Sequence, residues 1–473
     1  MSTARLCAAL RAASIEIESE PAELTAYESD FGRLVRGRAL GAIRPKTTAE
    51  VARVMTVARE LGVGVTVRCG GASQSGQSVA NDTFVLDLSR LRALDGSDLA
   101  SGQITVEPAI TFREILEQAL PRGLALPVSP LNLDLSVGGV LSAGGMGSTS
   151  HRHGLLVDHV VRAEVVLGTG ETVIVDPEQR RELYDVVLGG VGRAGILTRV
   201  TLRLVPAASA LRTTVLLARD LGAALAAQSR LASMLEIEHL DLVCAPAVLG
   251  LMRTPDGGRT PLRRWSHALH VTTRAGVDGS AWSSDLSDLE TVHVESDDAM
   301  AFAARFDARF RAMRATGAWE QAHPWFEAFV PASRAREAIE RAMAMPPFLA
   351  ELVRATPVAS DTRATRPRGL AMPDGPTFVV ALLPAGVPPA LVPAARQALT
   401  ALDDAYAELG AKRYLSGWLP RIAALGWQEH HGASLDVVAA AVRRSDPSGT
   451  LRSKLPSVRA SEPPRALASP ASR

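Results

Sequence analysis

The sequence predicts an α+β protein built in two parts, and three observations lead to that expectation. In the first 206 residues, short apolar runs alternate with helical patterns and are joined by glycine-rich loops. Beyond Pro206-Ala-Ala-Ser the pattern changes to longer helices alternating with strands. The length of 473 residues also exceeds the size at which a single hydrophobic core stops growing.

Each expected element follows from its local pattern. In the first part, helical spacing of apolar residues predicts helices over 49–61, 112–121 and 182–187, and apolar or alternating runs predict strands over 63–67, 83–88, 103–106, 160–167, 172–175 and 196–205. In the second part, we expect helices over 219–233, 298–316, 334–344 and 389–409, and strands over 237–244, 267–273, 325–331 and 377–384. Residues 253–265 and 355–375 resemble exposed loops, 434–442 a helix, and the tail from 456 a disordered segment.

Composition argues against several classes of partner. The 51 basic residues balance 50 acidic ones, and no basic stripe is interleaved with aromatics, so a nucleic-acid partner is not expected. No apolar stretch approaches the roughly 20 residues of a membrane span. The amino terminus is interrupted by Arg5 and Arg11, so we expect no signal peptide, and Cys7, Cys69 and Cys244 form neither a metal spacing nor an even disulfide framework. A cytoplasmic protein is the expectation.

A loop of small residues, Val67 to Ser78, follows the expected strand over 63–67. Its glycines allow the backbone to adopt positive φ and approach a ligand closely, and successive N–H groups in such a turn form a nest for oxygen anions. A cofactor with a diphosphate group suits this loop. From the loop alone, an ordinary solvent-exposed turn remains an equal alternative.

A second stretch of the same character lies between Leu131 and Gly154. Its two Gly-Gly pairs and its hydroxyl side chains again indicate backbone that lies against a ligand. Gly144 to Gly147 lacks the strict Gly-x-Gly-x-x-Gly spacing, so a Rossmann fold is only weakly indicated. The histidine pairs of the chain lack the spacing of a zinc helix, and no Gly-x-Ser-x-Gly elbow supports a hydrolase triad.

Several motifs, taken in order, resemble flavin oxidoreductases of the vanillyl-alcohol oxidase type, and the cytokinin dehydrogenases among them most closely. The loop Arg68-Cys-Gly-Gly-Ala-Ser-x-x-Gly-Gln resembles the family's Arg-Gly-x-Gly-His-Ser-x-x-Gly-Gln. Ser136-Val-Gly-Gly-Val-Leu-Ser and Leu188-Gly-Gly-Val-Gly-Arg-Ala-Gly-Ile-Leu-Thr-Arg resemble two further family motifs. His323-Pro-Trp-Phe-Glu-Ala-Phe-Val-Pro-Ala-Ser and Lys412-Arg-Tyr-Leu resemble segments of the cytokinin dehydrogenases. The resemblance extends over most of the chain.

The resemblance implies a two-part FAD-binding domain with an α/β substrate-binding cap. The FAD-binding domain would comprise residues 1–206 and 411–455, the cap residues 207–410, and the disordered tail residues 456–473. By position in the motifs, the residues implied to bind FAD are Cys69, Gly70, Gly71, Ser73, Gln77, Ser136, Ser142, Met146, Leu197 and Tyr414.

Two departures from the family's motifs bear on the chemistry. Ala72 stands where the family has the histidine that bonds covalently to the flavin, so we expect FAD to be held non-covalently, with Cys69 not serving as a substitute. Leu131 stands where cytokinin dehydrogenases have a catalytic aspartate, and a leucine cannot act as a base. Asp134, an odd number of residues away on an assumed strand, would point to the other face. Asp241 stands roughly where the family has an acidic residue that contacts the substrate, so the resemblance implies that it is the candidate catalytic carboxylate; a solvated strand carboxylate is the alternative.

The sequence thus predicts an FAD-dependent oxidoreductase, either an oxidase or a dehydrogenase. It would take a hydride from a small organic substrate and pass electrons to O₂ or another acceptor, in a specialised bacterial pathway. We expect it to bind neither a membrane nor a nucleic acid. Cytokinin is not the expected substrate, because Leu131 replaces the base. The alternative is a degenerate family member that binds flavin or another ligand without redox turnover. The oligomeric state is not predicted.

Overall fold

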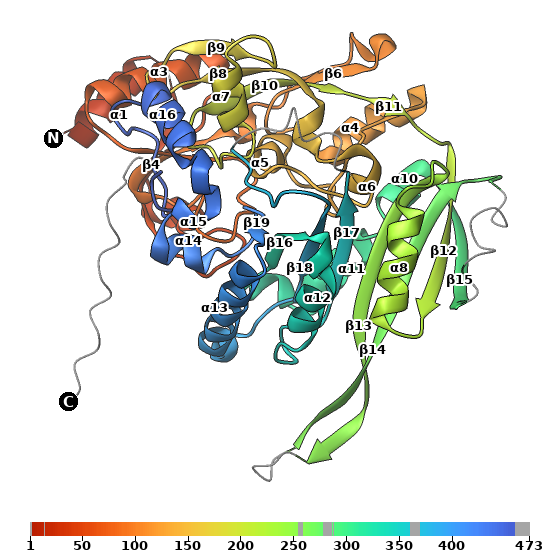
Figure 1. Ribbon diagram of the computed structural model, residues 1–473. Coiled ribbons are helices and arrows are strands. Elements are labelled where there is room, and N and C mark those ends of the chain that lie inside the picture. Colours follow the sequence, from red (N-terminus) through yellow and green to blue (C-terminus); the bar gives the residue numbers. More distant parts are fainter. Residues whose placement is uncertain are drawn as a thin grey trace, which may run out of the picture.

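The computed structural model describes residues 2–13, 15–253, 259–277, 286, 288–359 and 369–458, which form three larger sheets and one two-stranded sheet (Figure 1). Helix α1 (Ser2–Ala12) precedes the first sheet, and the short helix α2 (Pro21–Leu24) follows its first strand. Among the helices described, none combines the length and the apolar character that crossing a membrane requires.

The first sheet places the glycine-rich loop. Its strands lie in the order β1 (Ile17–Glu18), β2 (Arg38–Ile43), β4 (Asn81–Asp87), β3 (Val65–Arg68), and β4 runs parallel to both β2 and β3. Helix α3 (Thr48–Glu60) joins β2 to β3 and begins where the Thr47 side chain accepts the Glu50 N–H. Its apolar face packs against the sheet in one hydrophobic cluster. The glycine-rich loop therefore leaves the carboxyl end of a parallel strand, where ligands of such sheets commonly bind.

The second sheet carries the other glycine-rich segments. Its antiparallel strands lie in the order β5 (Leu94–Asp95), β6 (Gln103–Val106), β10 (Ile196–Arg203), β8 (Val160–Val166), β9 (Thr172–Val175). A Thr111–Glu114 capping box begins α4 (Phe112–Ala119). The remaining elements of this part are β7 (Leu124–Ala125), α5 (Val137–Ala143), α6 (Ser150–His153), α7 (Arg181–Val187) and β11 (Val205–Pro206).

The third sheet is antiparallel and has eight strands. Their order is β15 (Leu289–Asp298), β12 (Ala210–Ala218), β14 (Arg259–Arg274), β13 (Ile237–Arg253), β17 (Val353–Val358), β18 (Thr377–Leu382), β16 (Phe326–Pro331), β19 (Lys412–Arg413). Helices α8 (Leu221–Leu231), α12 (Ala335–Met343) and α13 (Val392–Glu408) cover one face of this sheet (Figure 1). Their leucines and alanines form one hydrophobic cluster with that face. The opposite face is left for the site described below.

The end of the chain returns to the first part. Helices α14 (Pro420–Leu425), α15 (Gln428–His431) and α16 (Leu435–Ser445) follow β19, and α16 lies beside α7 (Figure 1). Leu419, Trp427 and Val442 belong to the same hydrophobic cluster as the strands of the second sheet. Helices α10 (Ala299–Ala303) and α11 (Asp307–Ala315) connect the long strand β15 to the remainder of its sheet.

Most expected elements are present, and the structure corrects several of them. The expected loop over 253–265 is wrong in part, because β13 and β14 stay paired as far as Arg253 and Arg259 and form a projecting ribbon. The expected loop over 355–375 begins inside β17, whose six residues are all buried. This segment is a strand because it pairs with a neighbouring strand on each side, and local composition does not reveal such pairing. The single helix expected over 298–316 is interrupted between α10 and α11.

Two further expectations concern the ends of segments. The short stretch around Asp134 is not a strand, so the argument that its side chain points away from Leu131 does not hold. The expected disorder from residue 456 is wrong for its beginning, since Val458 is buried and the Trp427 ring N–H donates to the Pro456 carbonyl over 2.9 Å. Residues 459–473, like 360–368 in the expected loop, lie outside the described residues.

Candidate functional site

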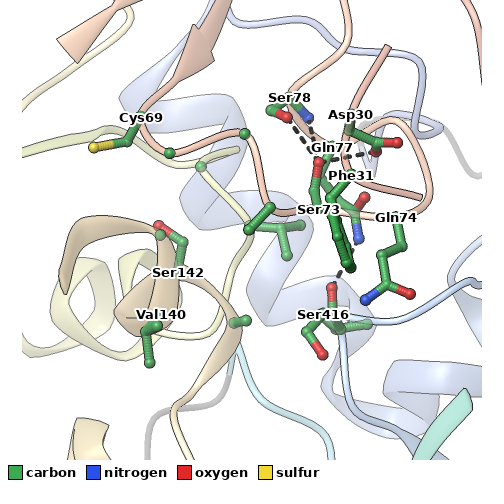
Figure 2. A pocket seen from close by; sticks show the side chains of 18 of the residues that line it. Asp30, Phe31, Cys69, Ser73, Gln74, Gln77, Ser78, Val140, Ser142 and Ser416 are labelled. Atoms are coloured by element: carbon green, nitrogen blue, oxygen red, sulfur yellow. Dashed lines mark hydrogen bonds between the residues drawn. The ribbon is translucent and has the colours of Figure 1, made fainter. Parts of the chain in front are cut away.

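A cavity of about 1280 Å³ lies where the glycine-rich loops meet the uncovered face of the eight-stranded sheet. Side chains of the first glycine-rich loop, of α5 and of the stretch after β19 surround it (Figure 2). Ligand pockets are commonly about 300 to 1,000 Å³, so this one has room for a large cofactor together with a second molecule. The structure brings all ten residues of the expected cofactor set to its lining: Cys69, Gly70, Gly71, Ser73, Gln77, Ser136, Ser142, Met146, Leu197 and Tyr414.

Two glycines bring the backbone of the first loop to the cavity. Gly71 has φ +66°, and a Cβ there would lie 2.4 Å from the Arg68 guanidinium. A Cβ on Gly70 would lie 3.3 Å from the Ser136 hydroxyl, at the start of α5. Any larger side chain would therefore narrow the space between the two glycine-rich segments.

Asp30 holds this loop in place. One oxygen of its carboxylate accepts the Ser73 hydroxyl over 2.9 Å (Figure 2). The same oxygen accepts the Gly76 N–H over 2.8 Å. The other oxygen is buried and has no hydrogen-bond partner among the described residues. Burial raises the pKa of Asp30 to about 6, against the pull of these two hydrogen bonds and of Arg68.

The side chains of the loop are also tied to the end of the chain. The Gln77 side-chain N–H₂ donates to the Leu415 carbonyl over 2.8 Å, and its oxygen accepts the Ser75 N–H. Tyr414 is buried, and its hydroxyl accepts the Gly145 N–H over 2.9 Å, beside α5. The segment after β19 thus closes the cavity against both glycine-rich segments.

Arg193 lines the cavity, and its buried guanidinium has no ionic partner among the described residues. Its Nε donates to the Gly190 carbonyl over 3.0 Å, and its guanidinium lies 3.5 Å from the centre of the Trp427 ring. Both terminal nitrogens are buried without a hydrogen-bond partner among the described residues. Burial lowers the pKa of Arg193 to about 9, with no carboxylate opposing the shift. A buried unpaired cation is costly, so an anionic ligand at this point would stabilise it.

Comparison with known proteins supplies the family. A protein-family model described as an FAD binding domain matches residues 39–176. An uncharacterised oxidoreductase, ORF5 of the fasciation locus of Rhodococcoides fascians, is 30% identical over 323 residues, which cover 68% of this chain and 71% of that protein. The chain is a cytokinin dehydrogenase-like member of the vanillyl-alcohol oxidase family.

Plant relatives are similar over a larger share of this flavoprotein. Cytokinin dehydrogenase 6 of Oryza sativa subsp. japonica is 26% identical over 89% of this chain and 88% of its own length. Cytokinin dehydrogenase 10 of the same subspecies is 26% identical over 92% of this chain and 87% of its own length. The protein is an FAD-dependent oxidoreductase with an α+β FAD-binding fold, and it uses a small-molecule substrate and an electron acceptor.

The residues of the cavity fit FAD. The nest around Gly71 offers backbone N–H groups, and Arg193 offers an unpaired guanidinium that suits a diphosphate. Ala72 also lines the cavity, and its methyl group offers no atom for a covalent link. Cys69 donates to the Pro108 carbonyl over 3.4 Å, and burial raises the pKa of this thiol to about 11. It is therefore a thiol rather than a reactive thiolate at neutral pH.

Asp241, the expected catalytic carboxylate of the flavoprotein, does not line the cavity. It is buried and pairs with Arg354 Nη2 at 2.7 Å, and it accepts the Thr356 hydroxyl over 2.7 Å. Burial alone would raise the pKa of Asp241, but Arg354 and Thr356 bring it below its ordinary value. Arg354 and Thr356 themselves line the cavity, so Asp241 stands one residue behind its wall.

The structure reveals a carboxyl group that sequence reasoning missed. Glu327 on β16 lines the cavity and accepts a hydrogen bond from the Ser416 hydroxyl, and burial raises its pKa. The signal was present in the His323 to Ser333 motif, where Glu327 occupies a position that the family pattern leaves unspecified. A single sequence does not show that the side chain of Glu327 faces the cavity.

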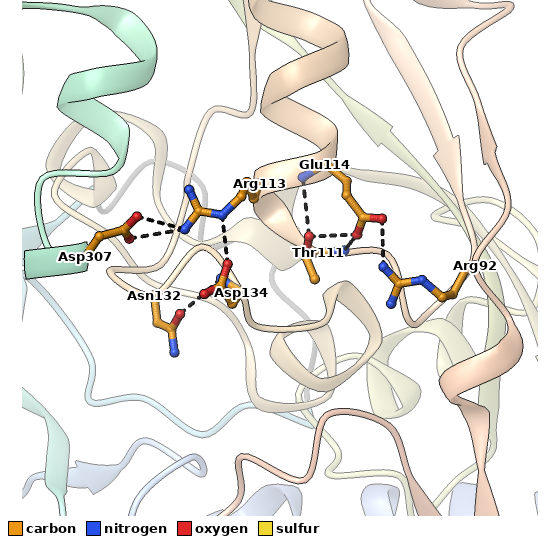
Figure 3. A network of polar contacts seen from close by, with 7 residues as sticks. All are labelled: Arg92, Thr111, Arg113, Glu114, Asn132, Asp134 and Asp307. Atoms are coloured by element: carbon orange, nitrogen blue, oxygen red, sulfur yellow. Dashed lines mark hydrogen bonds and ion pairs between the residues drawn. The ribbon is translucent and has the colours of Figure 1, made fainter. Parts of the chain in front are cut away.

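The neighbourhood of Leu131 contains a carboxylate that is already engaged. Leu131 and Asp134 both line the cavity. Arg113 on α4 lies between Asp134, at 2.8 Å, and Asp307 on α11, at 3.0 Å (Figure 3). This network connects the first part of the chain to α11 rather than supplying a free base.

Proposed function

We propose that this flavoprotein holds FAD non-covalently and takes a hydride from a small organic substrate lying between the flavin and the eight-stranded sheet. Electrons would then pass to O₂ or another acceptor. The observation that carries the proposal is the shared cavity, which Ala72 of the glycine-rich loop and Glu327 of the sheet both line. The ten cavity-lining residues expected from the motifs would form the cofactor site.

We also propose the domain division that the motifs imply. Residues 1–206 and 411–455 would form the FAD-binding domain, and residues 207–410 the substrate cap. Support comes from the hydrophobic clusters, since the covered face of the eight-stranded sheet packs into one cluster and the second sheet with α14 and α16 into another. Residues 456–458 would belong with the FAD-binding domain, because Val458 packs into that second cluster.

We propose Glu327 as the proton acceptor, in place of the catalytic aspartate that cytokinin dehydrogenases have at the position of Leu131. FAD, when bound, supplies the acceptor for a hydride. As the substrate C–H bond breaks with its electron pair, the proton of the adjacent hydroxyl or amine would pass to the Glu327 carboxylate, leaving a C=O or C=N bond in the product. A raised pKa suits this role, because general bases work best with a pKa near the working pH.

The substrate that we propose is not cytokinin but an intermediate of a specialised bacterial pathway. The support is Leu131, which leaves the cytokinin dehydrogenase position without a carboxylate. A second candidate function rests on the same residue together with Ala72: a family member that binds flavin without redox turnover. The experiment below separates the two.

The purified protein should be yellow, and acid precipitation should release its flavin absorbance into the supernatant. Gly71→Val should abolish flavin retention, because the side chain enters the space between the loop and Arg68. Gly123→Val, at a glycine with no atom within 4 Å of a Cβ, is the matched control for a positive-φ glycine and should retain flavin.

Three outcomes would decide between the candidates. Flavin that stays with the precipitate would contradict the non-covalent site, and a colourless protein that ignores added FAD would contradict flavin binding as a whole. Flavin that is photoreduced but is not reoxidised by air or by an artificial acceptor would favour the second candidate.

A further inference from the structure

Three strands of the eight-stranded sheet place a glutamate and an arginine in one row of the cavity wall. Glu327 on β16 is paired in register with Ala381 on β18, and Ala381 is paired with Arg354 on β17. Residues directly opposite each other on neighbouring strands point to the same face of a sheet. Glu327, Ala381 and Arg354 all line the cavity, in agreement with this register.

Asp241 supports Arg354 from the neighbouring strand. On β13, Val243 is paired with Arg354, which places Asp241 beside Thr356 at the next level of the same face. The Asp241 carboxylate pairs with Arg354 Nη2 at 2.7 Å and accepts the Thr356 hydroxyl over 2.7 Å, while lying outside the cavity lining. Asp241 is therefore a positioning residue, which fixes the guanidinium plane at the wall.

The charge of this wall is positive. The charged residues that the sheet and α11 contribute to the lining are Arg309, Arg314 and Arg354 against Glu327. Arg309 donates to the Leu383 carbonyl over 2.7 Å rather than to a carboxylate, and Arg314 lies 4.1 Å from the centre of the Trp319 ring. A low-dielectric cavity with such a wall attracts anions.

A second buried arginine of the sheet shows how Arg354 differs. Arg413 donates through Nε to the Glu327 carbonyl over 3.0 Å and through Nη2 to the Trp418 carbonyl over 2.7 Å, and its Nη1 lies 3.0 Å from Asp403. It does not line the cavity. Arg354 pairs through Nη2 alone in the described contacts, and its Nε is buried without a hydrogen-bond partner. Each arginine keeps one buried nitrogen without a hydrogen bond, Nη1 in Arg413 and Nε in Arg354, so the difference between them is their position: Arg354 lines the cavity and Arg413 does not.

We propose that Arg354, held by Asp241, binds a carboxylate group of the substrate, so that the substrate is a small organic acid. Phe306, whose ring centre lies 5.2 Å from the Arg354 guanidinium, and Phe310 would pack against its apolar part. The guanidinium group of an arginine can donate two parallel hydrogen bonds to the two oxygens of a carboxylate. It therefore distinguishes a carboxylate substrate from a neutral substrate of the same shape. This inference rests on the proposed function, since it assigns the substrate class of that same site.

The test compares benzoate with the uncharged benzamide as probes of the holoprotein. Binding is followed by the flavin absorbance change and separately by tryptophan fluorescence, because Trp319 and Trp325 line the cavity. Benzoate should bind at least tenfold more tightly than benzamide. Arg354→Gln should weaken benzoate about 10- to 100-fold, the usual range for losing a charged hydrogen-bonded contact, and leave benzamide within threefold. Arg354→Lys should lie between, and Arg413→Gln, the control, should leave the preference intact.

Equal affinities of the two probes for the unaltered protein, or full benzoate affinity in Arg354→Gln, would overturn the proposal. Because losing one partner of the Asp241 pair can prevent folding, the comparison in the unaltered protein decides the matter if that variant is not obtained. A protein that retains flavin but shows no preference for charge refutes this inference alone. A preference seen by fluorescence in a protein that binds no flavin refutes the proposed function instead.

Discussion

Glu327 is the residue on which the proposed chemistry depends most. Its carboxyl group lines the cavity next to the segment that contains Tyr414 and Ser416, and the Tyr414 N–H donates to the Glu327 carbonyl over 3.0 Å. Ala72 and Leu131, by contrast, are the positions at which the resemblance to the family's motifs predicts that a reactive group is missing. The chemistry at these positions is decided by single side chains rather than by the fold.

Glu327→Gln should retain flavin and lower kcat about 10²- to 10⁴-fold, the usual contribution of a general base. Because the ionised form of Glu327 is the base and burial raises its pKa, activity of the unaltered protein should rise with pH through that raised pKa. The variant should lose this acid limb of the pH profile. Steady-state kinetics from pH 4 to 9 measure both effects, with Glu337→Gln on α12 as control, and a variant within threefold of the unaltered kcat would contradict the role.

At the scale of elements, the glycine-rich loop is held by a carboxylate outside it. Asp30 bonds both the Ser73 hydroxyl and the Gly76 N–H, and the pKa of its carboxyl is raised from 3.8 to about 6. The folded protein therefore binds the Asp30 proton more tightly than the unfolded chain does. The stabilising contribution of that proton is fully present below pH 3.8 and is lost as the pH rises through about 6.

Asp30→Asn should remove this pH dependence. A shift of about two pKa units corresponds to about 3 kcal/mol, so the unfolding free energy of the variant relative to the unaltered protein should rise by about that amount between pH 4 and pH 7. Urea denaturation at several pH values measures the difference. Asp436→Asn, at an exposed position of α16, provides the control. A difference that does not change with pH would show that Asp30 is not the group concerned.

The elements that the sequence failed to predict are those that long-range pairing decides. β17 contains Pro357 and Arg354 and has the composition of a loop, yet it lies between β13 and β18 in the sheet. The outer half of β13 and β14 is exposed, and these strands satisfy their backbone hydrogen bonds chiefly through each other. Local propensity is too weak to predict such pairings.

At the scale of the whole molecule, the end of the described chain belongs to the cavity. The Val65 N–H donates to the Thr450 carbonyl over 2.8 Å, and the Arg452 N–H donates back to Val65 over 2.9 Å, beside the start of the glycine-rich loop. Leu455 and Val458 are buried in the cluster of the second sheet. Strand β3 and the last described segment, 448–458, thus form one wall of the cavity together.

Ending the chain after Pro447 should lower both flavin affinity and stability, because it removes this wall and the burial of Leu455 and Val458, each worth about 1.5 to 3 kcal/mol. Ending it after Val458 is the matched control and should preserve both, since it keeps every described residue that lines the cavity. Flavin fluorescence titration and thermal unfolding compare the two. Equal flavin affinity in both truncated proteins would contradict the assigned wall.

The sequence by itself determined the family and the cofactor, and its contiguous motifs predicted a set of cofactor residues. Ten expected cofactor residues line one cavity because glycine-rich turns act locally, through backbone conformations that few other residues adopt. Only the tertiary structure decided which of two carboxylates on the strands of the eight-stranded sheet, Asp241 or Glu327, lines that cavity. Asp241 and Glu327 both lie on strands, and the pairing of β13, β17, β18 and β16 places Asp241 beside Arg354, outside the lining, and Glu327 at the wall. Such a register depends on pairings between residues far apart in the chain, for which a single sequence carries no local signal.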